Sequence, residues 1–344
     1  MGFREIIKLS RLGSITAIMA ATLVGGAAAA ETAVRFTLDS KFAGTAAPFL
    51  IGVDKGYYRA ERLAVTIDEA TDPLEPISRV ASGAYDIGFA DINLLIKFRD
   101  LNPGTPIKAV FMVYNKPAYA IVSRKSRGVT KPKDLEDKKL GAPAADIAFA
   151  QWKIFAQVNE IDTSRVAIEN VGFPVREPLL QNGQVDAIVG LSYAIVPKLK
   201  SMGLQADDIV VLPMADHGIK LYGSAIIVNP KFAAEQPEAV KSFLQAFLRG
   251  LKETMRNPVH AVDSALARND AATKEVELER LRMTLKDNVL TPEVKAFGYG
   301  GIDFTRLDRA IEQIASNYEF KAKPKAADIF DASFLPTAAT RKAF

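Results

Sequence analysis

Short runs of β-branched and aromatic residues alternate with longer segments of helical periodicity, and this alternation limits the possible folds more than any other feature. The first predicted strands are 34–38, 64–69 and 85–90, and the first predicted helices are 47–55, 74–82 and 92–99. An order of strand, helix, strand, helix, strand is typical of a right-handed unit with parallel strands. The sequence therefore predicts an α/β unit in the first third of the chain.

The same alternation returns in the middle of the chain. The predicted strands there are 107–114, 119–123, 139–141, 166–171 and 185–189, and the predicted helices are 147–159 and 177–181. A β-branched run at 224–228 is predicted to return to the first unit. The helices predicted after it are 236–256, 258–267, 274–284 and 305–316. Because a chain of this length exceeds what one hydrophobic core usually serves, two lobes are expected.

We expect an α/β fold with two lobes, each a mainly parallel sheet flanked by helices. The first lobe is predicted to be discontinuous, 31–118 plus 224–344, and the second lobe to be 119–223. Two segments, 119–123 and 224–228, are predicted to run side by side as the hinge. In such a clamshell the ligand lies between the lobes, at the carboxyl ends of the strands. For the tail from position 321, packing on the first lobe and disorder both remain open.

The first thirty residues have the pattern of an export signal. Three basic residues lie within 4–11, an uncharged stretch follows over 12–30, and Ala28 and Ala30 are the small residues that suit signal peptidase. An uncleaved membrane anchor is the alternative, but the end of the stretch is only weakly apolar. We therefore predict a signal peptide at 1–30, cleavage after Ala30, and a mature protein in the periplasm.

Charge and residue counts exclude several classes of function. Residues 1–30 contain three of the 44 Lys and Arg residues and one of the 40 Asp and Glu residues, so the mature chain is close to charge balance. No concentrated basic tract is present, and no nucleic-acid partner is expected. The absence of cysteine excludes disulfides, thiolate metal sites, a cysteine nucleophile and a lipid-modified cysteine anchor. His217 and His260 are isolated, and we predict neither a metal site nor a cofactor.

Three stretches resemble the motifs of one protein family. Residues 47–58, which end in K-G-Y-Y, and the following 61–65 are similar to an opening of a helix, K-G-Y-F and E-x-G-L-x-V, with Arg62 where glycine is usual. Residues 79–90 resemble the segment L-x-x-G-x-x-D-x-G, and 179–187 resemble its counterpart in the second lobe. The chain thus resembles the periplasmic solute-binding proteins of ABC transporters that bind nitrate, taurine, alkanesulfonates and thiamine precursors.

The resemblance implies a periplasmic-binding-protein clamshell of type II and a function in import. A protein of this kind is a monomer that captures a small-molecule ligand, closes its lobes and delivers the ligand to a membrane permease with its ATPase. The resemblance also implies a binding protein rather than an enzyme. A ligand-sensing periplasmic receptor of the same fold remains an alternative, because sensing and transport both depend on lobe closure driven by the ligand.

The loops that follow the predicted strands, and the residues near the predicted hinge, supply the candidate ligand-binding residues. They are Asp39, Lys41, Phe42, Asp72, Asp91, Asn93, Asn115, Asp146, Arg176, Tyr193 and Tyr222. Helix capping is an alternative role for Asp72 and Asp146, and pairing with Glu177 or Glu169 is one for Arg176. Trp152 has Phe149 and Phe155 at helical spacing, which favours core packing over stacking on a ligand.

The balance of charge in this set favours one class of ligand. It contains four aspartates but only two basic residues, Lys41 and Arg176, so a small anion is expected to be repelled. A nitrogenous heterocycle such as a pyrimidine, sandwiched by Phe42, Tyr193 or Tyr222, fits these groups and the thiamine-precursor branch of the family. A binder of nitrate, taurine or another sulfonate is the alternative. A pyrimidine-synthesis enzyme on the same fold is a further one, against which the absence of cysteine argues.

Overall fold

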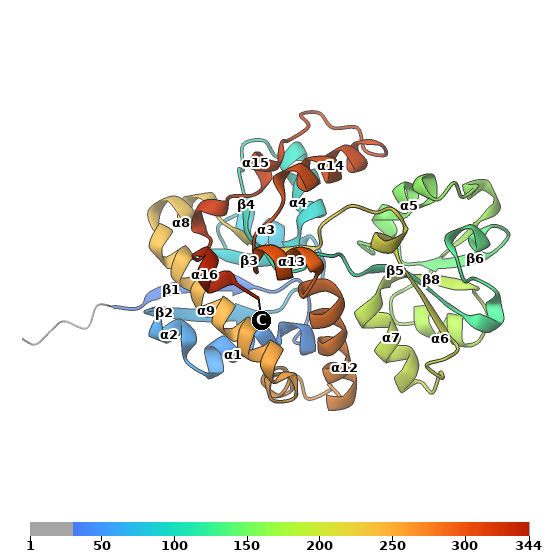
Figure 1. The fold of residues 1–344 in the computed structure, drawn as a ribbon, viewed down its shortest axis with the longest axis horizontal. Coiled ribbons are helices and arrows are strands. Elements are labelled where there is room, and N and C mark those ends of the chain that lie inside the picture. The colour runs from blue at the N-terminus through green and yellow to red at the C-terminus, as the bar shows by residue number, and fades with distance from the viewer. Residues whose placement is uncertain (1–29, 344) are drawn as a thin grey trace, which may run out of the picture. The chain divides into compact units, whose positions relative to one another are not determined.

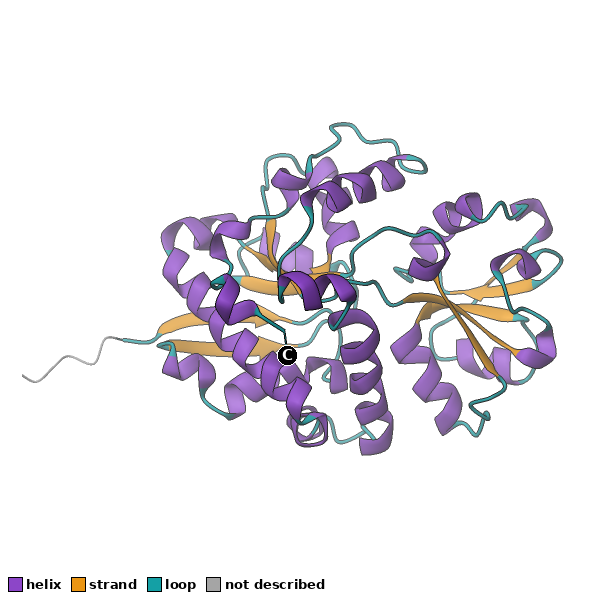
Figure 2. Cartoon of the chain, in the orientation of Figure 1, coloured by secondary structure: helices purple, strands orange, loops and turns teal. Residues whose placement is uncertain are grey.

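A computed structural model describes residues 30–343. The predicted signal peptide, 1–30, lies outside the described residues except for its last position. The chain forms two five-stranded sheets, each flanked by helices, as expected for a two-lobed α/β protein (Figures 1 and 2). We call each sheet with its helices the first lobe and the second lobe. Within residues 30–343, no helix has both the length and the apolar character that a membrane crossing requires.

The sheet of the first lobe has the strand order β2-β1-β3-β10-β4. Its strands are β1 Thr32–Thr37, β2 Leu63–Asp68, β3 Ile87–Asp91, β4 Lys108–Met112 and β10 Ser224–Val228. Strands β1, β2 and β3 are parallel, and β10 is antiparallel to both β3 and β4. The prediction of a mainly parallel sheet is confirmed, and the antiparallel strand is the one with which the chain returns to this sheet.

The sheet of the second lobe repeats this arrangement with the order β7-β6-β8-β5-β9. Its strands are β5 Tyr119–Arg124, β6 Lys139–Ala142, β7 Ala167–Asn170, β8 Ala187–Leu191 and β9 Ile209–Pro213. Strand β5 is antiparallel to β8 and β9, whereas β6 is parallel to β7 and β8. Sequence reasoning missed β9, although its run of Ile, Val and Leu between Asp208 and Pro213 has the pattern of a strand.

The helices cover both faces of the sheets. In the first lobe they are α1 Ala47–Asp54, α2 Tyr57–Ala60, α3 Glu75–Ala81, α4 Ile92–Leu101, α8 Pro230–Glu235, α9 Pro237–Arg256, α10 Pro258–Ala261, α11 Asp263–Leu266, α12 Lys274–Thr284, α13 Pro292–Phe297, α14 Phe304–Ala315, α15 Ala326–Ile329 and α16 Ala338–Arg341. In the second lobe they are α5 Trp152–Val158, α6 Arg176–Gln181 and α7 Ser192–Ser201. The predicted helix 258–267 is divided into α10 and α11, and α7 was not predicted.

Aromatic rings hold helices α1 and α9 against the first sheet. The ring of Phe49 on α1 lies 4.9 Å from that of Phe36 on β1 and 4.4 Å from that of Phe247 on α9. Gly250 allows the two helices to approach closely, because a Cβ atom at that position would lie 2.5 Å from the carbonyl oxygen of Pro48. The long α9 therefore packs its apolar face against α1 and the first sheet, while its opposite face, which includes Glu238 and Lys241, is exposed.

The predicted hinge segments are wrong. Residues 119–123 lie in β5 and 224–228 form β10, and these strands belong to different sheets. Fully buried runs of β-branched residues are typical of central strands, and both segments are central. The chain instead crosses between the lobes at 113–118 and 214–223. These crossing segments touch each other where the amide of Gly223 donates to the carbonyl of Tyr114 over 2.9 Å.

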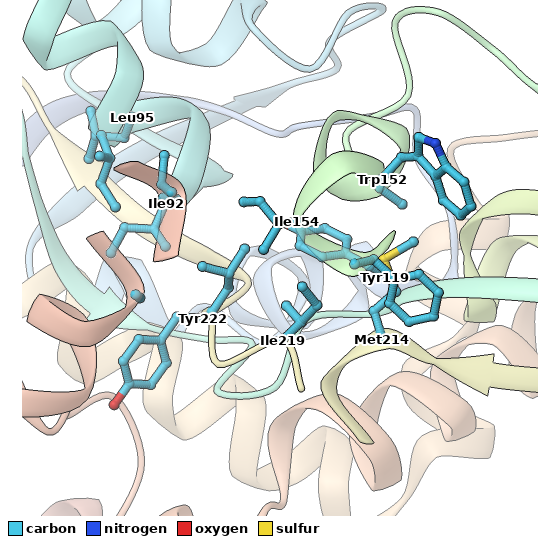
Figure 3. Close-up of a cluster of buried hydrophobic side chains, with 14 of the residues drawn as sticks. Ile92, Leu95, Tyr119, Trp152, Ile154, Met214, Ile219 and Tyr222 are labelled. Carbon is cyan, nitrogen blue, oxygen red and sulfur yellow. The ribbon is translucent and has the colours of Figure 1, made fainter. Parts of the chain in front are cut away.

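A cluster of buried apolar side chains includes Met214, Ile219 and Tyr222 of the second crossing segment (Figure 3). It joins Ile92 and Leu95 of the first lobe to Ile219 of the second crossing segment and to Trp152 of the second lobe. Trp152 is 6% exposed, so it packs in this core, as its helical spacing favours. The second crossing segment is thus packed against apolar side chains of both lobes.

Residues 321–343 of the tail pack on the first lobe. Phe330 is buried and forms a parallel bridge with Ala109 of β4, and the amide of Asp331 donates to the carbonyl of Ala109 over 2.8 Å. Farther along, the carbonyl of Arg341 accepts a hydrogen bond of 2.8 Å from the amide of Tyr299. Of the two alternatives left open for this tail, packing on the first lobe is the correct one.

Candidate functional site

A cavity of about 570 Å³ lies where strands of both sheets end. Asp39 follows β1, Asp91 ends β3, and Leu191 ends β8, so the carboxyl ends of strands from the two lobes meet there. The side chains that line it are Asp39, Ser40, Lys41, Ala43, Thr45, Ala70, Thr71, Pro73, Asp91, Asp146, Ile147, Phe173, Leu191, Tyr193, Ala194 and Arg280. Its size and mixed lining are those of a small-molecule site.

Asp39 is the cavity carboxyl group with the least compensation. It accepts a hydrogen bond of 3.1 Å from the hydroxyl of Ser40, and it has no ion pair within residues 30–343. Burial and, to a smaller extent, the nearby charge of Asp91 raise the pKa of Asp39 to about 7, whereas hydrogen bonds from Ser40 and Ser224 lower it. A carboxylate in this environment gains from a ligand that donates hydrogen bonds or carries positive charge.

Asp91 is buried and fully engaged by the protein. One of its oxygens accepts from the amides of Asn93, over 2.9 Å, and Leu94, over 3.1 Å, because Asp91 caps helix α4. Its other oxygen accepts a short hydrogen bond from the hydroxyl of Tyr119. Burial raises the pKa of Asp91, and the hydrogen bonds oppose that rise. Asp91 therefore presents a carboxyl group that is already oriented by the helix terminus and by Tyr119.

Asp146 is held by a buried ion-pair network in the second lobe. Its carboxylate accepts from Arg176 over 2.9 Å and from the amide of Ala148 over 2.8 Å. Arg176 is 6% exposed and also bonds the carboxylate of Glu177. Gly190 leaves room for this guanidinium group, since a Cβ atom there would collide with it. Arg176 thus positions Asp146 from behind and is not itself among the cavity residues.

Aromatic and apolar side chains complete the wall from the second lobe. Tyr193, at the start of α7, lies 6.2 Å from the ring of Tyr114 in an edge arrangement, and burial raises its pKa. Phe173 comes from the loop between β7 and α6 and is 47% exposed. A ring of this kind at the edge of a cavity can cover the face of a flat ligand.

The structure brings together five of the residues predicted from sequence. Asp39, Lys41, Asp91, Asp146 and Tyr193 line the cavity. This agreement follows from the rule that parallel strands present their carboxyl ends on one edge of a sheet.

The other predicted residues lie elsewhere. Phe42 packs partly buried against the first-lobe core, and Asp72 accepts from the amide of Leu74 over 2.8 Å, which is the capping alternative. Asn93 is buried beneath Asp91. Phe42 and Asp72 lie in loops that follow strands, as predicted, whereas Asn93 lies in the first turn of α4, and none of the three is among the residues that line the cavity.

Asn115 and Tyr222 belong to a network behind the crossing segments. The amide of Asn115 donates to Glu293 over 2.9 Å, and the hydroxyl of Tyr222 donates to the same carboxylate over 2.8 Å. Arg306 bonds Glu293 over 2.7 Å and lies 3.8 Å from the centre of the Tyr222 ring. These residues tie both crossing segments to α13 and α14, so their role in this structure is to support the hinge.

Sequence reasoning missed Arg280 of α12. Its guanidinium group donates to Glu277 over 3.0 Å, and Glu277 in turn accepts from the amide of Gly44 over 2.6 Å. The Nε atom of Arg280 is buried without a hydrogen-bond partner within the described residues. A helix that joins the site from far along the chain gives no strand-end signal, so no pattern in the sequence pointed to this residue.

No metal site is found among residues 30–343, where no three His, Asp or Glu side chains cluster as ligands. Neither histidine is among the residues that line the cavity. The chemistry available there is hydrogen bonding to carboxyl and hydroxyl groups, charge interaction with Lys41 and Arg280, and stacking on Tyr193 or Phe173.

Two relatives of this chain are named for different functions. The formylaminopyrimidine-binding protein of Halalkalibacterium halodurans is 27% identical over 246 residues, which are 69% of this chain and 72% of that protein. A 4-amino-5-hydroxymethyl-2-methylpyrimidine phosphate synthase of Aspergillus parasiticus is 25% identical over 302 residues, 84% of this chain and 81% of the synthase.

A solved structure identifies the fold. The periplasmic aliphatic sulphonate binding protein SsuA from Escherichia coli superposes with a TM-score of 0.68 at 13% identity, covering 87% of this chain and 92% of SsuA. Residues 44–261 match the family described as NMT1/THI5 like. With two α/β lobes and a cavity at their strand ends, the chain has the periplasmic-binding-protein fold and belongs to the NMT1/THI5 like family.

Proposed function

We propose that this protein is the substrate-binding component of an ABC-type importer and that it captures a nitrogenous heterocycle, such as a pyrimidine or thiamine precursor. The observation that carries the proposal is the cavity between the two lobes, where Asp39 offers a carboxyl group without a compensating cation in the described structure. A formylaminopyrimidine-binding relative supports the choice of ligand class.

The ligand chemistry follows from the groups of the cavity. Amino groups and ring N–H groups of an aminopyrimidine donate hydrogen bonds, and Asp39 can accept them. Tyr193 and Phe173 supply aromatic surface for the flat face of a heterocycle. Hydrogen bonds to a charged acceptor in a partly dry cavity are worth about 1.5–3 kcal/mol each, so Asp39 is expected to dominate specificity.

The test is thermal unfolding of residues 31–344 with aminopyrimidines, thiamine precursors, flavins, sulfonates and nitrate. A ligand that binds only the folded protein at a hundredfold excess over its dissociation constant stabilises it by about 2.7 kcal/mol. Asp39→Asn is expected to abolish the shift with aminopyrimidines, and Asp72→Asn, whose side chain lies outside the cavity wall, is the matched control. An unfolding midpoint of the wild type that no heterocycle shifts would contradict the proposal.

Transport requires closure of the lobes and release to a membrane partner. We propose lobe boundaries at 31–118 plus 224–344 and 119–223, a monomer in the periplasm after cleavage of the signal peptide, and delivery to a permease with its ATPase. The periplasmic-binding-protein fold supports this scheme. Stimulation of ATP hydrolysis by the cognate permease complex tests transport against a purely sensory role, because a sensor would leave that ATPase activity unchanged.

Arg280 favours a second candidate, a ligand with an anionic group. Its Nε atom is buried without a partner, and Lys41 makes no ion pair within residues 30–343. The cavity therefore offers two cationic groups, Lys41 and Arg280, the same number that the charge argument from sequence counted. Arg280 takes the place of Arg176, which is neutralised by Asp146 and Glu177, although Arg280 is also paired with Glu277. If sulfonates or nitrate bind, Arg280→Gln is expected to weaken them at least tenfold and to leave neutral pyrimidines within about threefold.

The synthase among the relatives raises the question of catalysis. We propose binding without chemical conversion. The cavity contains Lys41 but neither histidine, and the sequence has no cysteine. Mass spectrometry of a bound pyrimidine after prolonged incubation is expected to recover it unchanged, and conversion of the compound by the protein would favour the enzymatic alternative.

A further inference from the structure

A series of buried hydrogen bonds leads from the cavity to the second crossing segment and to Tyr119, the residue that follows the first one. The hydroxyl of Tyr119 donates to Asp91, which lines the cavity, and it accepts a bond of 2.9 Å from the side-chain amide of Asn93. The same amide donates to the carbonyl of Tyr222 over 2.8 Å. All four residues are at most 3% exposed, so water does not compete for these bonds.

The positions of these residues show which parts of the fold the hydrogen bonds connect. Tyr119 is the first residue of β5, directly after the crossing segment 113–118, whereas Tyr222 lies in the other crossing segment, 214–223. Asp91 and Asn93 belong to the first lobe, at the junction of β3 and α4. The bond between Tyr119 and Asp91 therefore connects the start of the second lobe to the cavity wall of the first.

One atom of this network lacks a partner. Asn93 Oδ1 is buried and accepts no hydrogen bond within the described residues. Its side-chain orientation is determined by chemistry, because the carbonyl of Tyr222 can accept only from the Nδ2 group. A buried acceptor without a donor is costly, so an arrangement of the crossing segments that supplies one gains free energy at this point.

We propose that Tyr119 is a positioning residue that couples ligand contact at Asp91 to the relative orientation of the two lobes. The inference rests on the proposed binding function. The bond between Tyr119 and Asp91 stabilises the arrangement of crossing segments seen in this structure. A ligand that donates to Asp91 shares the acceptor with Tyr119, weakens that bond, and frees the crossing segments to adopt a second arrangement, in which Asn93 Oδ1 gains a donor.

The test uses Tyr119→Phe and a distance measurement between the lobes. The sequence contains no cysteine, so two introduced cysteines can be labelled selectively. Spin labels at Ala206→Cys and Ala271→Cys, which are exposed and lie one in each lobe, report the distance between the lobes by double electron–electron resonance. Without ligand, Tyr119→Phe is expected to lower the ratio of molecules at the wild-type distance to molecules at other distances by at least threefold. This is the lower end of the range of about threefold to tenfold expected for loss of such a bond. Tyr299→Phe is the control, since that buried hydroxyl has no hydrogen-bond partner in the described structure.

A second variant keeps the test decisive if Tyr119→Phe folds poorly. Asn93→Ala removes the link to Tyr222 but leaves the bond between Tyr119 and Asp91, and it is expected to shift the same distance by a smaller factor. The double variant should show less than the product of the two single factors, because both act on one network. Distance distributions of both variants that match the wild type and Tyr299→Phe would overturn the inference.

This outcome is distinct from failure of the proposed function. The lobe distance is measured without ligand, so it remains informative if no heterocycle binds. If an aminopyrimidine does bind, its affinity for Tyr119→Phe should rise by about threefold to tenfold, because less of the resting arrangement has to be given up. An affinity that falls in Tyr119→Phe while the distance stays unchanged would assign Tyr119 to direct ligand support and contradict coupling.

Discussion

Replacing Asp39 by Asn is expected to stabilise the ligand-free protein above neutral pH. Burial raises the pKa of Asp39 to about 7 from its ordinary value of 3.8, so the folded protein holds this proton more tightly than the unfolded chain does. As the pH rises from 3.8 to about 7, the unfolded chain loses the proton first, and the free energy of unfolding falls. Above that range the free energy of unfolding has fallen by its full amount, and the uncharged side chain of Asp39→Asn avoids this fall.

The magnitude follows from the size of the shift. The difference between 3.8 and about 7 corresponds to a ceiling of ~4 kcal/mol at 1.36 kcal/mol per pKa unit. Asp39 is partly exposed, and solvent screening reduces the effect, so we expect a gain of about 1–2 kcal/mol in Asp39→Asn at pH 8. At pH 4.5 the wild-type carboxyl group is mostly protonated in the folded protein, and the two proteins should differ little.

The assay compares thermal midpoints of the wild type, Asp39→Asn and Asp72→Asn at pH 4.5 and pH 8. Asn at position 72 can still accept from the amide of Leu74, so this control should stay close to the wild type at both values of pH. The gain in Asp39→Asn should appear only at pH 8, as an increase of several degrees. Equal midpoints at pH 8, or a difference that does not depend on pH, would refute the assignment of a destabilising charge to Asp39.

Two further predictions concern packing. Gly190→Ala places a Cβ atom against the guanidinium group of Arg176 and disturbs its buried ion pair with Asp146, so we expect the free energy of unfolding to fall by about 3–5 kcal/mol in urea. Gly104→Ala is the control and should be neutral, because a Cβ atom there meets nothing within 4 Å. Phe247→Ala removes a buried ring that stacks on Phe49 of α1 and should lower the free energy of unfolding by about 3–5 kcal/mol. Phe297→Ala, at a side chain that is 74% exposed, should change it by less than about 0.5 kcal/mol. Equal losses in both variants would contradict the packing of α9 on α1.

Local pattern was sufficient for most of the fold. The alternation of apolar runs and helical periods predicted nine of the ten strands by position, because a buried parallel strand needs only a short β-branched run between turn signals. It also placed Asp39, Asp91, Asp146 and Tyr193 at strand ends, and the strands then carried them to one cavity. The hinge was misplaced because a buried β-branched run looks the same in a hinge strand and in the centre of a sheet.

The sequence by itself determined the two-lobed α/β plan and the edge of each sheet that lines the cavity, since both depend on neighbours along the chain. Only tertiary structure decided the composition of the cavity. Arg280 joins it because Glu277 of α12 accepts from Gly44, a contact between residues 233 positions apart. Arg176 is not among the cavity residues for the same kind of reason, because folding brings Asp146 and Glu177 to its guanidinium group. Charge balance in a cavity depends on which partners folding supplies, and that pairing acts through space rather than along the chain.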